Sequence, residues 1–199
     1  MMSKIGIFGG SFNPIHNGHI YVAEKVKKLL ELDNIIFIPT GIAPHKDNSD
    51  FASREHRYNM VKLAVEGNFD ISDIEVKTDK VCYAVDTMTE IKKMYANDDL
   101  YYIIGADSLV TFMQWKEPLK LFKMLHLVVV DRAGADIDMV ADEYRQKYDA
   151  KITICHIEEY NVSSTEIRNQ IKHIGRCSGL IPEKVEEYII KHKLYTEDL

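Results

Sequence analysis

Two histidines three residues apart follow a pair of glycines near the start of the chain. Gly9 and Gly10 end a short apolar run, and His16 and His19 lie a few residues later. Glycine has no Cβ, so the backbone at Gly9 and Gly10 can approach a bulky anion closely. The spacing of the histidines allows both imidazoles to reach one phosphate group and donate hydrogen bonds as charge builds in a transition state.

A helix that begins near Asn17 or Gly18 would add unpaired N–H groups and a positive dipole end to this phosphate site. The ordinary alternative is a plain strand-to-helix turn with two unrelated histidines. The grouping of both histidines with an intervening glycine and a glycine pair favours the phosphate site. Other motifs do not fit, because GxGxxG and GxxxxGK followed by Ser or Thr are both absent, and no adjacent Cys, Asp or Glu completes a metal ligand set.

A second polar cluster lies near the end of the chain, at residues 163–168. Ser163 and Glu166 have the spacing of a capping box, which predicts the start of a helix. Capping leaves Ser164, Thr165 and Arg168 unexplained. Hydroxyls, free N–H groups and a guanidinium in one helical turn together favour a polyphosphate-binding site.

The pattern of apolar residues predicts the elements that must position these clusters. Short apolar runs predict buried strands, and apolar residues at helical spacing predict helices between them. The predicted strands are Ile5–Phe8, Ile35–Ile38, Tyr101–Ile104, Leu127–Val130 and Ile152–Ile154. Helical segments are expected over residues 20–30, 53–67, 85–95, 163–174 and 182–192, with Pro182 in a first turn and a polar loop at 40–52. This alternation predicts an α/β, Rossmann-like fold, with an open, mainly parallel sheet, helices on both faces and a helical C-terminal end.

Composition bounds the function further. With 199 residues, 46% of them hydrophobic, the chain is expected to form a single domain over residues 1–199, with a helical subdomain from about 160 to 199. The net charge of -6 argues against nucleic acid as a partner. The three cysteines form no CxxC pattern, no leader peptide is visible, and the longest apolar run is too short for a bilayer. We expect a soluble cytoplasmic protein without a membrane partner; whether it forms a homo-oligomer stays open.

The segment from Gly9 to His19 resembles the HxGH signature of the nucleotidylyltransferase superfamily, in the form carried by bacterial nicotinate-nucleotide adenylyltransferases. Ser163 to Arg168 resembles the second signature of that superfamily. The resemblance implies that both helix starts meet over the phosphates of ATP and that His16, His19 and Arg168 are catalytic. It implies an ATP site made of Gly9, Gly10, Ser11, Phe12, His16, Gly18, His19, Lys46, Gly105, Asp107, Ser163, Ser164, Thr165 and Arg168.

Four further segments resemble the nicotinate-nucleotide branch. They are Ala43–Lys46, Tyr83–Thr87, Gly105–Leu109 with Trp115, and Val128–Arg132. The resemblance implies a nicotinate mononucleotide site made of Ser11, Thr40, His45, Lys46, Thr87, Trp115 and Arg132. The chain departs from the family pattern at Ser11, Asn13, Ala43, Ala84 and Ala133. The residues after Arg168 match no motif and are interpreted as helical closure.

The implied reaction transfers the adenylyl group of ATP to nicotinate mononucleotide in NAD biosynthesis, with Mg²⁺ bound to ATP and no dedicated protein ligands for a metal. Nicotinamide mononucleotide and phosphopantetheine are alternative acceptors, and the phosphopantetheine branch fits the motifs less well. A nucleotide-binding regulator without turnover is a different class, and the intact histidines argue against it. An NAD-dependent oxidoreductase would need the missing GxGxxG.

Overall fold

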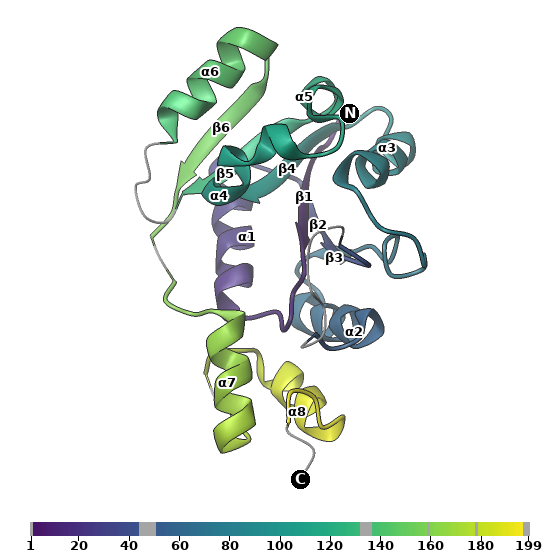
Figure 1. Ribbon diagram of the computed structural model, residues 1–199, viewed down its shortest axis with the longest axis vertical. Coiled ribbons are helices and arrows are strands. Elements are labelled where there is room, and N and C mark those ends of the chain that lie inside the picture. The colour runs from purple at the N-terminus through teal and green to yellow at the C-terminus, as the bar shows by residue number, and fades with distance from the viewer. Residues whose placement is uncertain (1, 44–50, 132–136, 159, 178, 197–199) are drawn as a thin grey trace. The chain divides into compact units, whose positions relative to one another are not determined.

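The computed structural model describes residues 2–43, 51–131, 137–158, 160–177 and 179–196 (Figure 1). Its contacts divide the chain into two compact units, each built from three segments. The first unit comprises Met1–Gly9, Val22–Ile36 and Cys82–Glu159, and the second comprises Gly10–Tyr21, Phe37–Val81 and Tyr160–Leu199.

A six-stranded sheet organises the fold, with strand order β3-β2-β1-β4-β5-β6. The strands are β1 (Lys4–Gly10), β2 (Asn34–Pro39), β3 (Asp70–Ile71), β4 (Asp99–Gly105), β5 (His126–Asp131) and β6 (Lys151–His156). Within the first unit, β1 pairs with β4, β4 with β5 and β5 with β6, each in parallel. Their apolar side chains are buried, as expected for parallel strands covered on both faces.

The helices of the first unit connect these strands. They are α3 (Ala84–Met94), α4 (Ala106–Val110), the 3₁₀-helix η1 (Phe112–Gln114), α5 (Pro118–Met124) and α6 (Asp138–Tyr148). Helix α3 packs against α5, and α6 runs along β6 (Figure 1). Helix α1 (Asn17–Leu30) begins in the second unit and ends in the first.

The second unit contains three further helices, α2 (Arg54–Val65), α7 (Ser164–Ile174) and α8 (Glu183–Lys191). Local sequence sets their ends. The Ser53 side chain accepts the His56 N–H at the start of α2, and Gly175 takes a left-handed φ of 76° where α7 ends. Helix α2 packs against α8, whose inner face buries Val185 and Ile189.

The predicted fold class is confirmed, and each of the five predicted strands is present. Strand β3 was not predicted, because two residues give no periodic pattern. Helices α4, α5 and α6 were also not predicted. Pro182 caps α8 from outside and does not lie in its first turn, a small correction to the expected boundary. The single domain over residues 1–199 stays a prediction. Within the described residues, no helix has both the length and the apolarity to span a bilayer.

Candidate active site

The turn between β1 and α1 is built around a buried aromatic ring. Phe12 has a left-handed φ of 45°, and its ring meets the edge of the His19 ring with centroids 5.1 Å apart. A Cβ on Gly10 would lie 2.9 Å from this ring, which is itself buried. Gly10 is therefore required by packing inside the loop, in addition to any close approach of an anion.

The two histidines stack on each other. Their ring centroids are 3.7 Å apart with an interplanar angle of 29°, and the backbone N–H of His16 donates to Nδ1 of His19 at 3.2 Å. Because a backbone N–H can only donate, Nδ1 of neutral His19 is an acceptor and the ring proton lies on Nε2. The His16 side chain is buried, while His19 is partly exposed. His19 is therefore the more accessible of the two imidazoles.

Gly18 makes room for this arrangement. A Cβ at Gly18 would lie 3.0 Å from Nδ1 of His16 and 3.0 Å from Cγ1 of Val162. Both neighbours are buried and have little space to move. The glycine between the histidines therefore lets the chain before α7 pack against the first turn of α1.

The two clusters identified in the sequence are in direct contact. The hydroxyl of Ser164 donates to the carbonyl of Pro14 at 3.0 Å, and Nη1 of Arg168 donates to the carbonyl of Asn13 at 2.9 Å. Nη2 of Arg168 also contacts the Thr165 hydroxyl at 3.3 Å. The bonds to Pro14 and Asn13 join positions 150 and 155 residues apart in the sequence. The first turn of α7 and the loop before α1 are therefore in contact, and we call these two segments the phosphate cluster (residues 10–19 and 163–168).

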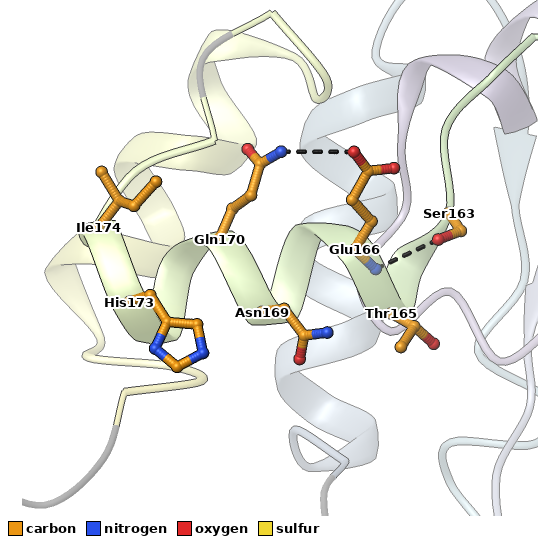
Figure 2. A pocket seen from close by; sticks show the side chains of 7 residues that line it. All are labelled: Ser163, Thr165, Glu166, Asn169, Gln170, His173 and Ile174. Atoms are coloured by element: carbon orange, nitrogen blue, oxygen red, sulfur yellow. Dashed lines mark hydrogen bonds between the residues drawn. The ribbon is translucent and has the colours of Figure 1, made fainter.

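Helix α7 borders an open pocket of about 420 Å³ along its whole length (Figure 2). Its lining residues are Ser163, Thr165, Glu166, Asn169, Gln170, His173 and Ile174. The Ser163 hydroxyl accepts the Glu166 N–H at 3.1 Å, as the capping motif predicts, and the Glu166 carboxylate accepts from Gln170 at 3.4 Å. The hydroxyl of Thr165 therefore lies on an accessible, hollowed face of the helix.

Arg57 is a buried cation that holds the loop between β1 and α1, and it was not predicted from the sequence. Arg57 is only 4% exposed, and its guanidinium donates to the carbonyls of Ser11 at 2.7 Å, Ala52 at 3.2 Å and Gly41 at 3.3 Å. Burial lowers the pKa of Arg57 from its usual value. A signal was present in the sequence, because Arg57 shares the buried face of α2 with Met60 and Val61.

Comparison with known proteins shows the family to which the chain belongs. Residues 7–170 match the model of the cytidylyltransferase-like family. A Clostridium tetani protein named nicotinate-nucleotide adenylyltransferase is 42% identical over 199 residues, which covers 98% of this chain and 100% of the relative. The chain belongs to the nicotinate-nucleotide adenylyltransferase family. A family relative from Carboxydothermus hydrogenoformans is 38% identical over 97% of this chain and 98% of its own.

The fold is also that of a solved structure. The Plasmodium falciparum nicotinic acid mononucleotide adenylyltransferase complexed with NaAD superposes with a TM-score of 0.77 at 22% identity, covering 97% of both chains. At that identity the likeness shows the fold alone. The family membership itself rests on the closer relatives and on the family model.

Among the described residues, two of the predicted acceptor residues lie in the first unit, Thr87 and Trp115. Thr87 is in the first turn of α3 and is buried, and Trp115 follows η1, half-buried, with its ring 5.0 Å from that of Phe112. An ion pair of 2.8 Å between Lys116 and Asp86 joins the neighbours of these two residues. The structure therefore brings the two segments together, although 28 positions separate Thr87 from Trp115.

The remaining predicted site residues have varied settings. Gly105 precedes α4 and Asp107 lies in its first turn, both exposed in the first unit. In the second unit, the N–H of Thr40 donates to the carbonyl of Gly10 at 2.8 Å, which ties the loop after β2 to the phosphate cluster. Three predicted residues lie outside the described residues, namely His45, Lys46 and Arg132.

Proposed function

We propose that this chain transfers the adenylyl group of ATP to nicotinate mononucleotide, forming nicotinate adenine dinucleotide and pyrophosphate. The observation that carries the proposal is the contact between the two halves of the phosphate cluster, through Ser164 on Pro14 and Arg168 on Asn13. This contact gathers an imidazole donor, hydroxyls, a guanidinium and the start of a helix in one place. Such a set suits the α-, β- and γ-phosphates of a nucleoside triphosphate.

In the proposed reaction, a phosphate oxygen of the mononucleotide attacks the α-phosphorus of ATP. The bond from the α-phosphorus to the bridging oxygen breaks, and pyrophosphate leaves with that oxygen. A phosphate monoester is already anionic near neutral pH, so the enzyme needs no covalent nucleophile, and catalysis rests on positioning and charge stabilisation.

The proposed roles of the residues rest on the family resemblance and, for His19 and Arg168, also on the contacts of their side chains. Neutral His19 carries its ring proton on Nε2, so we place this imidazole on the α-phosphate, with His16 stacked against it and assigned to the neighbouring phosphate. Arg168 and the amides near Thr165 would hold the leaving pyrophosphate. The loop around the phosphates would be shaped by Gly9, Gly10, Ser11, Phe12 and Gly18. The rest of the ATP site would consist of Lys46, Gly105, Asp107, Ser163 and Ser164.

We assign the acceptor to a second set of residues. Trp115 would stack on the pyridine ring, and Arg132 would meet negative charge on the mononucleotide. Thr87 would contact the mononucleotide as well. The two loops that follow β1 and β2 would contribute further contacts through Ser11, Thr40, His45 and Lys46.

Mg²⁺ would accompany ATP, held by oxygens of the triphosphate, and would offset the charge of that group. Among the residues that the structure describes, no three His, Cys, Asp or Glu side chains are grouped so that they could hold a metal ion.

We place the enzyme in the reducing cytoplasm. Its three cysteines are free thiols, and burial raises the pKa of the Cys177 thiol to about 11.

One experiment tests the function. Purified protein and Mg-ATP are incubated in turn with nicotinate mononucleotide, nicotinamide mononucleotide and phosphopantetheine, and pyrophosphate release is followed. Release chiefly with nicotinate mononucleotide supports the proposal. Faster release with another acceptor would reassign the substrate, and release with none would reduce the chain to a nucleotide-binding protein.

A further inference from the structure

The last segment that the structure describes, after α8, returns to the phosphate cluster. After α8, Lys193 and Tyr195 have left-handed φ angles of 51° and 62°, and these turns redirect the backbone. The Tyr195 hydroxyl then donates to Oδ1 of Asn13 at 2.8 Å, across 182 positions of sequence. The C-terminal segment therefore contacts the loop that carries the two histidines.

Asn13 is the point where three segments meet. Its side chain is 2% exposed, and Oδ1 accepts from the Ala52 N–H at 3.1 Å as well as from Tyr195. The Ala52 N–H can only donate, so the amide oxygen must face it, and the Tyr195 hydroxyl must then be a donor too. The backbone carbonyl of the same asparagine accepts from Nη1 of Arg168.

The chemistry of Tyr195 suits a permanent donor. Burial raises the pKa of its hydroxyl above the usual value, although the cations of Arg168 and Arg57 act in the opposite direction. The hydroxyl stays protonated at neutral pH.

The loop needs such anchors. Phe12 is held in a left-handed conformation that is uncommon for a residue with a side chain, and such conformations persist only when the surroundings fix them. One anchor precedes Phe12, where Arg57 holds the Ser11 carbonyl, and the other follows it at Asn13. Tyr195 supplies part of the second anchor.

We infer that Tyr195 is a positioning residue for adenylyl transfer, because it fixes Asn13, whose carbonyl orients the guanidinium of Arg168. This inference rests on the proposed function. It gives the C-terminal segment a part in binding the triphosphate, beyond the helical closure expected from the sequence.

The test is Tyr195→Phe in the full chain, which removes the hydroxyl and keeps the ring. We expect kcat/KM for ATP to fall about 5- to 10-fold, the scale of one lost hydrogen bond, with KM for nicotinate mononucleotide unchanged. The affinity for a non-hydrolysable ATP analogue, measured by calorimetry, should fall by a similar factor. Tyr188→Phe is the matched control, because its hydroxyl bonds to His56 and Asn59 on α2. That control should change melting temperature without changing kcat/KM for ATP.

A double-mutant cycle separates positioning from general stability. In an Arg168→Met background, Tyr195→Phe should have little further effect on kcat/KM for ATP, because Tyr195 acts on ATP through Asn13 and the Arg168 guanidinium bound to it. All variants are assayed at a temperature where circular dichroism shows them folded. An unchanged kcat/KM and analogue affinity in Tyr195→Phe, or an equal loss in both backgrounds, would overturn the inference. The analogue affinity is informative even if no acceptor supports turnover, so failure of the proposed function is recognised separately.

Discussion

The phosphate cluster and the proposed acceptor residues of the first unit, Thr87 and Trp115, are built in different ways. The phosphate cluster is held mainly by bonds to backbone carbonyls, from Arg57, Ser164 and Arg168. Thr87 and Trp115 instead belong to helical segments whose neighbours are joined by an exposed ion pair, a contact that contributes little to stability. The triphosphate is the same for every acceptor, so its site can be fixed by backbone. Substitution of side chains on other segments can therefore change which acceptor binds and leave the site of adenylyl transfer unchanged.

This difference has a kinetic consequence. Variants in the phosphate cluster should lower turnover with every acceptor, while variants at the acceptor residues should change KM for the acceptor and leave ATP unaffected. Substitutions at His19, Arg168, Gly18 and Trp115 test this division.

Replacement of His19 by Ala should lower kcat by about 10² or more, because the donor to developing charge on the α-phosphate is lost. Steady-state pyrophosphate release measures it. His173→Ala is the matched control, since His173 is exposed in the last turn of α7 and, although it lines the pocket along that helix, it is assigned neither to ATP nor to the acceptor. A folded His19→Ala enzyme with wild-type kcat would remove His19 from the mechanism.

Replacement of Arg168 by Met should lower kcat/KM for ATP about 10- to 100-fold, the range for a hydrogen bond to a charged group. Arg168→Lys should recover only part of this loss, because Lys keeps the charge but not the planar fork. Arg176→Met makes the same substitution at an exposed position just after α7 and should leave the kinetics unchanged. A larger effect on the acceptor KM than on ATP would break the division.

Replacement of Gly18 by Ala should displace His16, because the new Cβ would lie 3.0 Å from its Nδ1. We expect kcat to fall about tenfold, less than the ~10² that a full 1 Å misplacement costs. Overpacking should also lower the free energy of unfolding by about 1 kcal/mol, after the better helix propensity of Ala is allowed for. Thermal denaturation measures this second effect, with Gly105→Ala as a control for stability alone, because nothing lies within 4 Å of a Cβ there. Wild-type kcat in Gly18→Ala would show that His16 has room to move.

Much of the fold could be predicted because each buried parallel strand is a continuous apolar run between polar turns. Strand β3 could not, since two residues carry no period, and its place depends on pairing within the sheet. Short helices such as α4 and α5 lack the length to show a helical repeat. Their existence depends on packing that a local pattern does not contain.

Some residues of the candidate site could likewise be predicted from the sequence, and others could not. The two signature segments could be found because their residues are close in sequence and share a recognisable spacing. The packing role of Gly10 could not be found, because it depends on where the ring of Phe12 lies. Tyr195 gave no signal at all, since its partner Asn13 is 182 positions away. The role of Arg57 could be predicted only in part. The sequence shows a cation on the apolar face of α2, but it does not show the three carbonyl groups that this cation binds.

Replacement of Trp115 by Leu should have the smallest effect of the four substitutions, and it should affect binding of the acceptor and not of ATP. Loss of ring stacking should raise KM for nicotinate mononucleotide about 2- to 10-fold, from the 0.5–1.5 kcal/mol typical of an aromatic pair, while KM for ATP stays constant. Trp115→Phe keeps an aromatic face and should recover most of the affinity. Because Trp115 is the only tryptophan, its fluorescence in the unmodified enzyme should also change as nicotinate mononucleotide is titrated in. A rise in KM for ATP, or fluorescence that responds to ATP alone, would place Trp115 with the phosphate cluster and undo the division between the two regions.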